Sequence, residues 1–477
     1  MTLYHAFRFS LFLLVGGLLL TGDVRRTPAV EKAELAKAME SVTAKELQTH
    51  AEFLADDTLE GREAGSRGGQ AAANYLTKEF ARHGLAAAGE NRSYFQSFNG
   101  SCRNILGIIE GSDPKLKEQV IVLGAHYDHV GYGRKGNSYG PIGYIHNGAD
   151  DNASGVSGLL EIVDAIKQLP TPPKRSILFA LWDGEEAGLL GSKHWISQST
   201  VPLSRISLCL NIDMIGRLKD HRLEVYGTRT LAGSRRVVCE ANAASDLSLV
   251  FDWQVKADSD HHPFFSQGIP FLMLHTGLHE NYHRPSDDAN LLNAEGMQQV
   301  TRLTLQTLLH YAEVDEIGRF RSASQQETNY HRQILEQPQQ AQPPRFGLPW
   351  QRAKGEELRI ILFPPTPGSA AEAAGLRAGD RLLKYDGAPI TNEDLLRLQL
   401  MAAVGKKNFT IEREGEKEPL EIAVTPRGSP IRVGISWRED PTEPGSVALT
   451  QVIPGSAAAL AGLANGDRLY SVGGRRF

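Results

Sequence analysis

The chain has 477 residues, of which 41% are hydrophobic and 22% are charged, and its formal net charge is −5. This composition is ordinary for a globular protein, and the length allows two or three domains. A mildly acidic chain without a basic stripe argues against nucleic acid as a partner, and three widely spaced cysteines exclude a disulfide framework.

Residues 1–22 are expected to be an export signal. Arg8 precedes a short apolar run, Phe9 to Leu20, and small and polar residues follow. A run of this length is shorter than the roughly 20 residues that span a bilayer, and it fits the apolar core of a signal peptide. An uncleaved anchor is the alternative. We expect cleavage near Gly22 and a periplasmic or secreted protein without a stable membrane anchor.

Residues 31–312 predict one large α/β domain. Residues 31–85 are expected to be helical apart from a polar loop at 61–69, and from residue 103 apolar runs alternate with helical stretches. The runs are NILGIIEG, VIVLGAH, SILFALWD, SLCLNID, RLEVYG and PFLMLHT, and the helical stretches are 154–169, 187–197, 232–244 and 294–312. This alternation indicates a mixed, largely parallel sheet with helices on both faces.

Five candidate metal ligands follow the expected strands or open the next helix. They are His126, Asp151, Glu186, Asp213 and His283. In sheets of this kind, ligands bind outside the carboxyl ends of the strands. One carboxylate shared by two metals, with a further carboxylate and histidine for each, makes a paired-zinc site that hydrolyses amides.

Several candidates have another explanation when each is considered alone. The pair Asp150–Asp151 could be only a helix N-cap, and the pair Glu185–Glu186 could be a solvated acidic turn. Asp213 lies inside an apolar run, where a lone carboxylate is costly unless it is paired or metal-bound.

The histidine candidates are also ambiguous. His126 could be a loop histidine, although Asp128 two residues later could orient its ring at a metal. His283 shares its segment with His275 and His279, and spacing alone does not choose among the three.

Residues 313–343 are rich in Gln and Pro and are predicted to be a linker. An internal repeat follows: residues 367–387 match residues 454–474 at 13 of 21 positions, with an offset of 87. The same offset superposes Phe346-Gly347-Leu348 on Val433-Gly434-Ile435.

Each repeat resembles a PDZ domain, a small β-rich domain whose Φ-Gly-Φ loop receives a peptide or protein C-terminus. The resemblance implies a complete domain at 344–426 and an incomplete second domain at 430–477. The second copy has no equivalent of residues 391–426, so we expect it either to be truncated or to be completed by a partner.

The stretch from about residue 45 to 312 resembles the co-catalytic di-zinc exopeptidases of metallopeptidase family twenty-eight, which include bacterial aminopeptidases and glutamate carboxypeptidase. The matching motifs are LADDTLEGREAGSRGG, HYD (126–128), GADDNASG (148–155), GEEAGLLGS (184–192), NIDMIG (211–216), SDHHPF (259–264) and YHRPSD (282–287).

The resemblance implies a role for each matching residue. Asp151 would bridge two zinc ions, Glu186 and His283 would complete one site, and His126 and Asp213 would complete the other. Asp128 would orient His126, Glu185 would be the general base, and Tyr282 would stabilise the oxyanion. The resemblance also implies that the peptide bond between Asp151 and Asn152 is cis.

The resemblance therefore implies an exported zinc aminopeptidase that acts on peptides, with two Zn²⁺ per chain. A carboxypeptidase or dipeptidase on the same core is an alternative, for which Arg217 or Arg284 could hold the substrate carboxylate. A glutaminyl-cyclase-like enzyme, with one zinc, is another. The alternative from a different class is an inactive PDZ-type scaffold.

Overall fold

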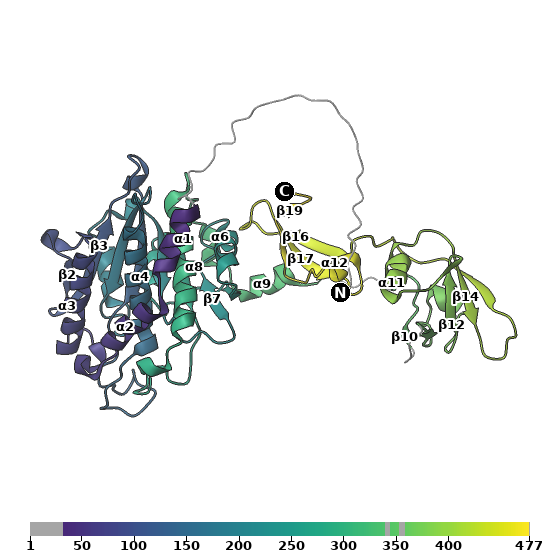
Figure 1. The fold of residues 1–477 in the computed structure, drawn as a ribbon, viewed down its shortest axis with the longest axis horizontal. Helices are drawn as coiled ribbons and strands as arrows, with labels where there is room; N and C mark the ends of the chain where they lie inside the picture. The colour runs from purple at the N-terminus through teal and green to yellow at the C-terminus, as the bar shows by residue number, and fades with distance from the viewer. Residues whose placement is uncertain (1–31, 339–343, 353–357, 477) are drawn as a thin grey trace, which may run out of the picture.

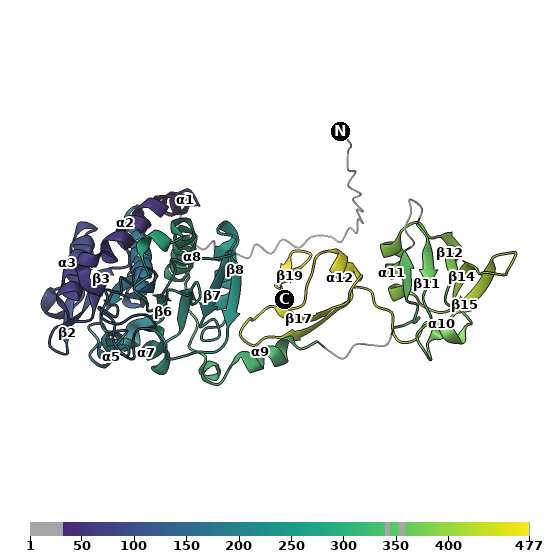
Figure 2. The same ribbon diagram turned by 90° about the horizontal axis from the view of Figure 1, so that it is seen from below.

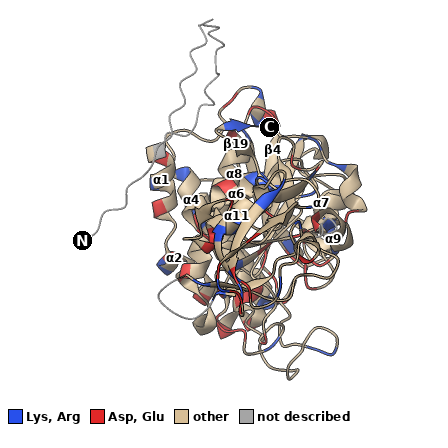
Figure 3. Ribbon diagram, turned by 90° about the vertical axis from the view of Figure 1, so that its right-hand side faces the viewer, with Lys and Arg blue, Asp and Glu red and all other residues tan. Residues whose placement is uncertain are grey.

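The computed structural model describes residues 32–338, 344–352 and 358–476, and the predicted signal peptide lies outside these residues (Figure 1). In the described part, no helix is long and apolar enough to cross a bilayer. Lys and Arg are interspersed with Asp and Glu across the view in Figure 3.

A nine-stranded mixed sheet forms the centre of the first domain (Figures 1 and 2). Its order is β1-β3-β5-β4-β6-β9-β7-β8, and β2 pairs with β3. The four central strands β5, β4, β6 and β9 run parallel, and antiparallel pairs join them to β3 on one side and β7 on the other. The predicted mixed, largely parallel sheet is confirmed.

The strands of this sheet are β1 (Ala86–Ala87), β2 (Phe95–Phe98), β3 (Cys102–Ile109), β4 (Val120–His126), β5 (Ser176–Trp182), β6 (Ile206–Ile212), β7 (Arg222–Tyr226), β8 (Ser248–Asp252) and β9 (Phe271–His275). The six predicted runs correspond to β3, β4, β5, β6, β7 and β9. The strands β1, β2 and β8 were not predicted, because they are short and only partly buried and so lack a continuous apolar run.

Helices cover both faces of the sheet, because side chains on a strand alternate between the two faces. Ile121 and Leu123 belong to a core shared with α1, α2, α3, α4, α6 and α8. Val120 and Val122 belong to a second core, to which α5 and α7 contribute Trp195 and Phe264.

The helices are α1 (Lys32–Ser41), α2 (Ala44–Leu54), α3 (Arg67–Arg82), α4 (Gly155–Lys167), α5 (Leu190–Ser197), α6 (Ser234–Ala241), α7 (His261–Ser266), α8 (Ala294–Glu313) and α9 (Asn329–Glu336). The four predicted helical stretches correspond to α4, α5, α6 and α8.

Part of the predicted linker 313–343 is folded against its neighbours, which differs from the expectation. It contains α9, and Glu327 accepts two hydrogen bonds of 2.8 Å from the guanidinium of Arg229. The Gln-rich composition gives no sign of this folded segment, because the contacts that hold it are polar and join residues distant in sequence. Residues 339–343 lie outside the described part.

The two repeats form separate small sheets (Figures 1 and 2). The first has the order β10-β11-β12-β14-β15, with β13 paired to β12, and the second has the order β16-β17-β18, beside a separate β19-β20 pair. Leu376 and Leu382 are buried in the first repeat, whereas their counterparts Leu463 and Leu469 are only half-buried. The difference arises because α11, β14 and β15 have no equivalent among the described residues of the second repeat.

The elements of the first repeat are β10 (Trp350–Arg352), β11 (Ile360–Leu362), α10 (Ala370–Ala373), β12 (Arg381–Tyr385), β13 (Ala388–Pro389), α11 (Glu393–Ala402), β14 (Lys407–Glu412) and β15 (Leu420–Val424). Those of the second are β16 (Ile435–Glu439), β17 (Val447–Val452), α12 (Ala457–Leu460), β18 (Arg468–Leu469), β19 (Ser471–Val472) and β20 (Arg475–Arg476).

The second repeat docks on the first domain through the loop that follows β16. The Arg229 guanidinium donates to Asp440 Oδ1 at 2.6 Å and lies 3.7 Å from the centre of the Trp253 ring. The Gly233 amide donates to the Thr442 carbonyl at 2.7 Å. Arg229, Asp440 and Thr442 are all buried, so the interface excludes solvent at this point. The buried Arg229 guanidinium is paired with the Asp440 carboxylate.

Candidate metal centre

The candidate site lies where the central parallel strands end. His126 is the last residue of β4, and Asp213 follows β6 directly. Glu186 and His283 lie in the segments after β5 and β9, and Asp151 lies in the turn that leads into α4. Because the carboxyl ends of parallel strands meet at one edge of the sheet, residues far apart in sequence converge there.

Two groups of potential ligands share one residue. His126, Asp151 and Asp213 form the first group, and His129, Asp151, Glu186 and His283 form the second. In each group the ligand atoms lie within 4.8 Å of one another. The structure thus brings all five predicted ligands together and adds His129, which the sequence reasoning missed.

Asp151 directs one oxygen to each group. Its Oδ1 lies 3.3 Å from His126 Nε2, which in turn lies 3.4 Å from Asp213 Oδ1. Its Oδ2 lies 3.1 Å from His283 Nε2, which lies 3.0 Å from Glu186 Oε2. A carboxylate with one oxygen facing each group has the geometry of a bridging ligand.

The donor set fits zinc, which binds imidazole nitrogen and carboxylate oxygen. Buried carboxylates that face one another repel unless a cation lies between them. Nε2 of His283 is buried and has no hydrogen-bond partner among the described residues, although two carboxylate oxygens lie nearby. A cation at each of the two positions would satisfy these atoms.

Glu185 and Glu186 are adjacent in sequence, but only one of them belongs to a ligand group. The Asp128 carboxylate accepts hydrogen bonds from both amides, at 3.0 Å from Glu185 N and 3.4 Å from Glu186 N. Glu186 belongs to the second group, whereas Glu185 belongs to neither. Burial raises the pKa of the Glu185 carboxyl well above its usual range, and the neighbouring Glu186 adds to this effect.

The imidazole of His126 is held by a backbone carbonyl. His126 Nδ1 lies 3.2 Å from the Asp128 carbonyl oxygen and 3.8 Å from the Asp128 carboxylate. The carboxylate is therefore too far for a hydrogen bond to this ring. Its contacts with the Glu185 and Glu186 amides show that it shapes the acidic segment instead.

The peptide bond between Asp151 and Asn152 is cis, as the family resemblance implied. Asp287 Oδ2 accepts hydrogen bonds from the amides of Asp150 and Asp151, at 3.0 and 3.1 Å. The Asn152 side chain donates to the Ile212 carbonyl at 3.0 Å, which ties this turn to the end of β6.

Asp150 and the two other candidate histidines have different partners. Asp150 Oδ1 accepts from the Gly216 amide at 2.6 Å, and its Oδ2 lies 3.1 Å from His279 Nε2. His275 Nδ1 accepts from the Gly277 amide at 2.7 Å. Of the three candidate histidines in this segment, only His283 joins a ligand group.

Arg62 is a second residue whose role the sequence reasoning missed. It is buried behind the site, and its guanidinium donates to the carbonyls of Tyr127, Asn147 and Gly148 at 2.6–2.9 Å. Burial lowers the pKa of this group to about 10, so it keeps its charge at neutral pH. Arg62 therefore braces the segments that carry His126 and Asp151.

Tyr282 lies against the last candidate ligand. Its ring stacks on that of His283 at 4.0 Å, and the exposed ring of Tyr139 lies 5.7 Å from both. Burial and the nearby Asp151 carboxylate raise the pKa of the Tyr282 phenol, which therefore stays protonated and can donate a hydrogen bond.

A model described as Peptidase family M28 matches residues 104–308, and one described as PDZ domain matches residues 364–412. The chain contains a peptidase family M28 domain followed by a PDZ domain. The M28 match includes all five predicted ligands. The predicted resemblance to metallopeptidase family twenty-eight is confirmed.

Curated relatives of the M28 domain include both aminopeptidases and carboxypeptidases. Aminopeptidase YwaD of Bacillus subtilis is 32% identical over 211 residues, which cover 42% of this chain and 43% of that protein. Leupeptin-inactivating enzyme 1 of Streptomyces exfoliatus is 27% identical over 225 residues, covering 46% and 47% of the two chains. The probable glutamate carboxypeptidase VP8 of Zea mays is 26% identical over 234 residues, covering 43% and 28%. The chain spans less than half the length of each.

A similar fold occurs in a solved structure of the LapA aminopeptidase from Legionella pneumophila. The TM-score is 0.50 with 21% identity, and the match covers 65% of this chain and 81% of that chain. At this identity the likeness supports the fold of the M28 domain.

Proposed function

We propose that this protein is a zinc-dependent aminopeptidase that removes N-terminal residues from peptides. The observation that carries the proposal is the position of Asp151, whose two oxygens face two separate ligand groups. A site for one metal gives no reason for one carboxylate to face two ligand groups, whereas a pair of neighbouring metals does.

Zinc ions at these positions would act as Lewis acids on the scissile carbonyl and lower the pKa of a bound water. Glu185 lies beside the groups without belonging to them, so it is free to move protons. We assign it the role of general base, which takes a proton from the attacking water and delivers it to the departing amine. Burial raises the pKa of this carboxyl, which favours its taking up the proton of the attacking water.

Tyr282 is proposed to stabilise the oxygen that gains negative charge during the attack. Its phenol is protonated, and its ring lies on His283, at the edge of the second group. A donor fixed at this place would strengthen its hydrogen bond as charge develops on the carbonyl oxygen.

The two arginines considered for a carboxypeptidase differ in availability. Arg217 donates to the Leu291 carbonyl at 2.7 Å and also to the Asn281 side chain, so it is already engaged. Arg284 is exposed next to His283 and has no ion-pair partner among the described residues. Arg284 therefore supports carboxypeptidase activity as the second candidate function.

A substrate panel tests the proposal. Purified protein would be assayed on aminoacyl anilides, on N-blocked peptides with a free C-terminus and on N-terminal glutaminyl peptides, with and without a chelator. We expect release from the free N-terminus, loss of activity with chelator and recovery with Zn²⁺. Cleavage of only the N-blocked peptides would replace this proposal with the carboxypeptidase, and cyclisation of glutaminyl peptides with one zinc per chain would replace it with the cyclase.

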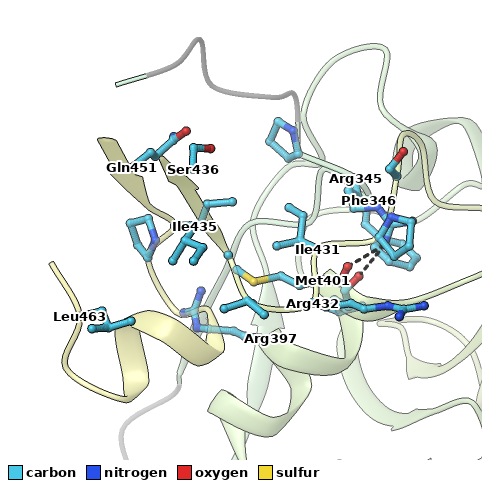
Figure 4. Close-up of a pocket in the computed structure, with 18 of the residues that line it drawn as sticks. Arg345, Phe346, Arg397, Met401, Ile431, Arg432, Ile435, Ser436, Gln451 and Leu463 are labelled. Carbon is cyan, nitrogen blue, oxygen red and sulfur yellow. Dashed lines mark hydrogen bonds between the residues drawn. The ribbon is translucent and has the colours of Figure 1, made fainter. Parts of the chain in front are cut away.

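The first repeat is proposed to bind the C-terminus of an apolar peptide. A cavity of about 1060 Å³ lies along α11 and the Phe346-Gly347-Leu348 loop, and the second repeat lines its other side (Figure 4). None of the residues that line this cavity is acidic. Arg345 already bonds to backbone carbonyls and Arg397 to Glu393, whereas Arg432 is exposed at the cavity and has no ion-pair partner among the described residues, so it is the cation assigned to the carboxylate. A peptide with a free carboxylate should therefore bind more tightly than its amidated form, and equal binding would refute the proposal.

Export is also proposed, on the basis of the apolar segment within residues 1–22. N-terminal sequencing of protein made with this segment and recovered outside the cytoplasm tests it. We expect a mature N-terminus near Asp23, and retention of Met1 in the cytoplasmic fraction would contradict it.

A further inference from the structure

His129 has the position of a metal ligand but a hydrogen-bonding pattern that does not suit one. It lies three residues after His126, it is buried, and its Nδ1 falls within the second ligand group. The same Nδ1 lies 2.8 Å from Glu186 Oε1 and 3.8 Å from Asp151 Oδ2. Its contact with Glu186 has the length of a hydrogen bond.

The identity of the donor in this hydrogen bond follows from the chemistry of Glu186. A carboxylate that binds a metal is ionised, and an ionised carboxylate only accepts hydrogen bonds. The proton must therefore be on His129 Nδ1. A ring nitrogen that carries a proton has no lone pair for a metal, so the same nitrogen cannot do both.

The other ring nitrogen points to the same assignment. His129 Nε2 is buried and has no partner among the described residues. If Nδ1 bound a metal, Nε2 would carry the proton. A buried N–H group without an acceptor is rarer in folded proteins than a buried acceptor without a donor. With the proton on Nδ1, Nε2 is left as an acceptor without a donor, which folded proteins tolerate better.

The first ligand group contains a parallel arrangement. Ser259 Oγ accepts a hydrogen bond from Asn211 at 2.8 Å, which directs its own proton to Asp213 Oδ2 at 2.6 Å. Asp213 Oδ1 is left facing His126. In both groups, a buried neutral donor therefore occupies one carboxylate oxygen and leaves the other for the cluster.

We propose that His129 is a positioning residue for the second metal, which donates from Nδ1 to Glu186 Oε1 and leaves Oε2 as the metal ligand. This inference rests on the proposed metal centre. It predicts that the second metal has three protein ligands, namely Asp151, Glu186 and His283, and that His129 acts only through Glu186.

The test compares two substitutions of His129 by zinc binding. His129→Asn places an amide N–H close to the position of Nδ1, whereas His129→Leu fills similar space without a donor. Metal-free proteins would be titrated with Zn²⁺ against a chromophoric chelator, which resolves the two sites. His50→Asn is the control for loss of a half-buried histidine, because His50 bonds to Tyr75 in the α2–α3 region, away from both ligand groups.

We expect His129→Asn to bind two zinc ions with an affinity close to that of the unsubstituted protein. His129→Leu should lose about 10–100-fold in affinity at one site only, the range found for residues that orient metal ligands. Chemical unfolding in chelator should give the same stability for both variants, which separates metal positioning from folding.

Two outcomes would overturn the inference. Equal loss of the second zinc in both variants would make His129 a ligand, and unchanged affinity in both would leave it without a role. Failure of the underlying metal centre is a separate result, because the unsubstituted protein would then bind fewer than two zinc ions.

Discussion

The two ligand groups around Asp151 differ in how the fold supports them. In the first, His126 ends β4 and Asp213 follows β6 directly, so both ligands are fixed by the sheet. In the second, Glu186 and His283 lie in segments that continue past β5 and β9, and His283 has a left-handed φ of 52°. Ligands held on regular elements are better pre-organised than ligands on loops. We therefore expect the first group to hold its metal more tightly.

A neighbouring side chain partly offsets this difference for the second group. Asp128 holds the amides of Glu185 and Glu186, which fixes the segment that carries Glu186. The second group thus depends on a side chain that fixes a loop, whereas the ligands of the first lie at the ends of two strands and Ser259 adds a hydrogen bond to Asp213. Substitutions of these supporting residues should therefore change the zinc affinity of one group without changing that of the other.

Asp151→Asn should have the largest effect, because this residue is the one that the two groups share. An amide presents one oxygen and cannot bridge two cations, so at least one zinc should be lost and peptidase activity should fall to background. Metal analysis together with the anilide assay measures both. Asp113→Asn is a suitable control, since Asp113 is half-buried and its side chain bonds only to local backbone amides and to no ligand. An Asp151→Asn protein with two zinc ions and normal turnover would contradict the claim that Asp151 bridges the two groups.

Glu185→Gln should have the next largest effect, and it should affect chemistry without affecting binding. Glu185 belongs to neither ligand group, so both zinc ions should remain. The loss of a general base should lower kcat by about 10²–10⁴-fold. Steady-state kinetics and metal analysis on the same preparation check this, and near-normal kcat would refute the assigned role.

Ser259→Ala should have a smaller effect, confined to the first group. It removes the donor to Asp213 Oδ2, and loss of such an orienting hydrogen bond lowers metal affinity by about 10-fold or somewhat more. Zinc titration would show one weakened site, distinct from the site that His129→Leu weakens. Ser157→Ala is the matched control, because Ser157 is also buried but donates to a helix carbonyl. Weakening of both sites to the same extent would contradict the division into two groups.

Much of the site could be predicted because its ligands follow apolar strands that the sequence marks clearly. VIVLGAH and SLCLNID end at His126 and Asp213, and parallel strands bring such ends together. The choice of His283 over His279 came from the family motif, and in the structure His279 contacts Asp150 instead.

The supporting residues could not be predicted, because their contacts are distant in sequence. His129 is 57 residues from Glu186, and Ser259 is 46 residues from Asp213. The same is true of Asp440, which is 211 residues from Arg229. Hydrophobic periodicity reports which face of an element is buried, and it contains no information on which polar side chains meet across such distances.

The most direct test of the central claim is the zinc content of the unsubstituted protein, measured against activity as metal is restored to the chelated form. A site bridged by Asp151 predicts two zinc ions per chain, filled in sequence, with full aminopeptidase activity at the second. Saturation of activity at one zinc per chain, with no second ion bound, would contradict the account.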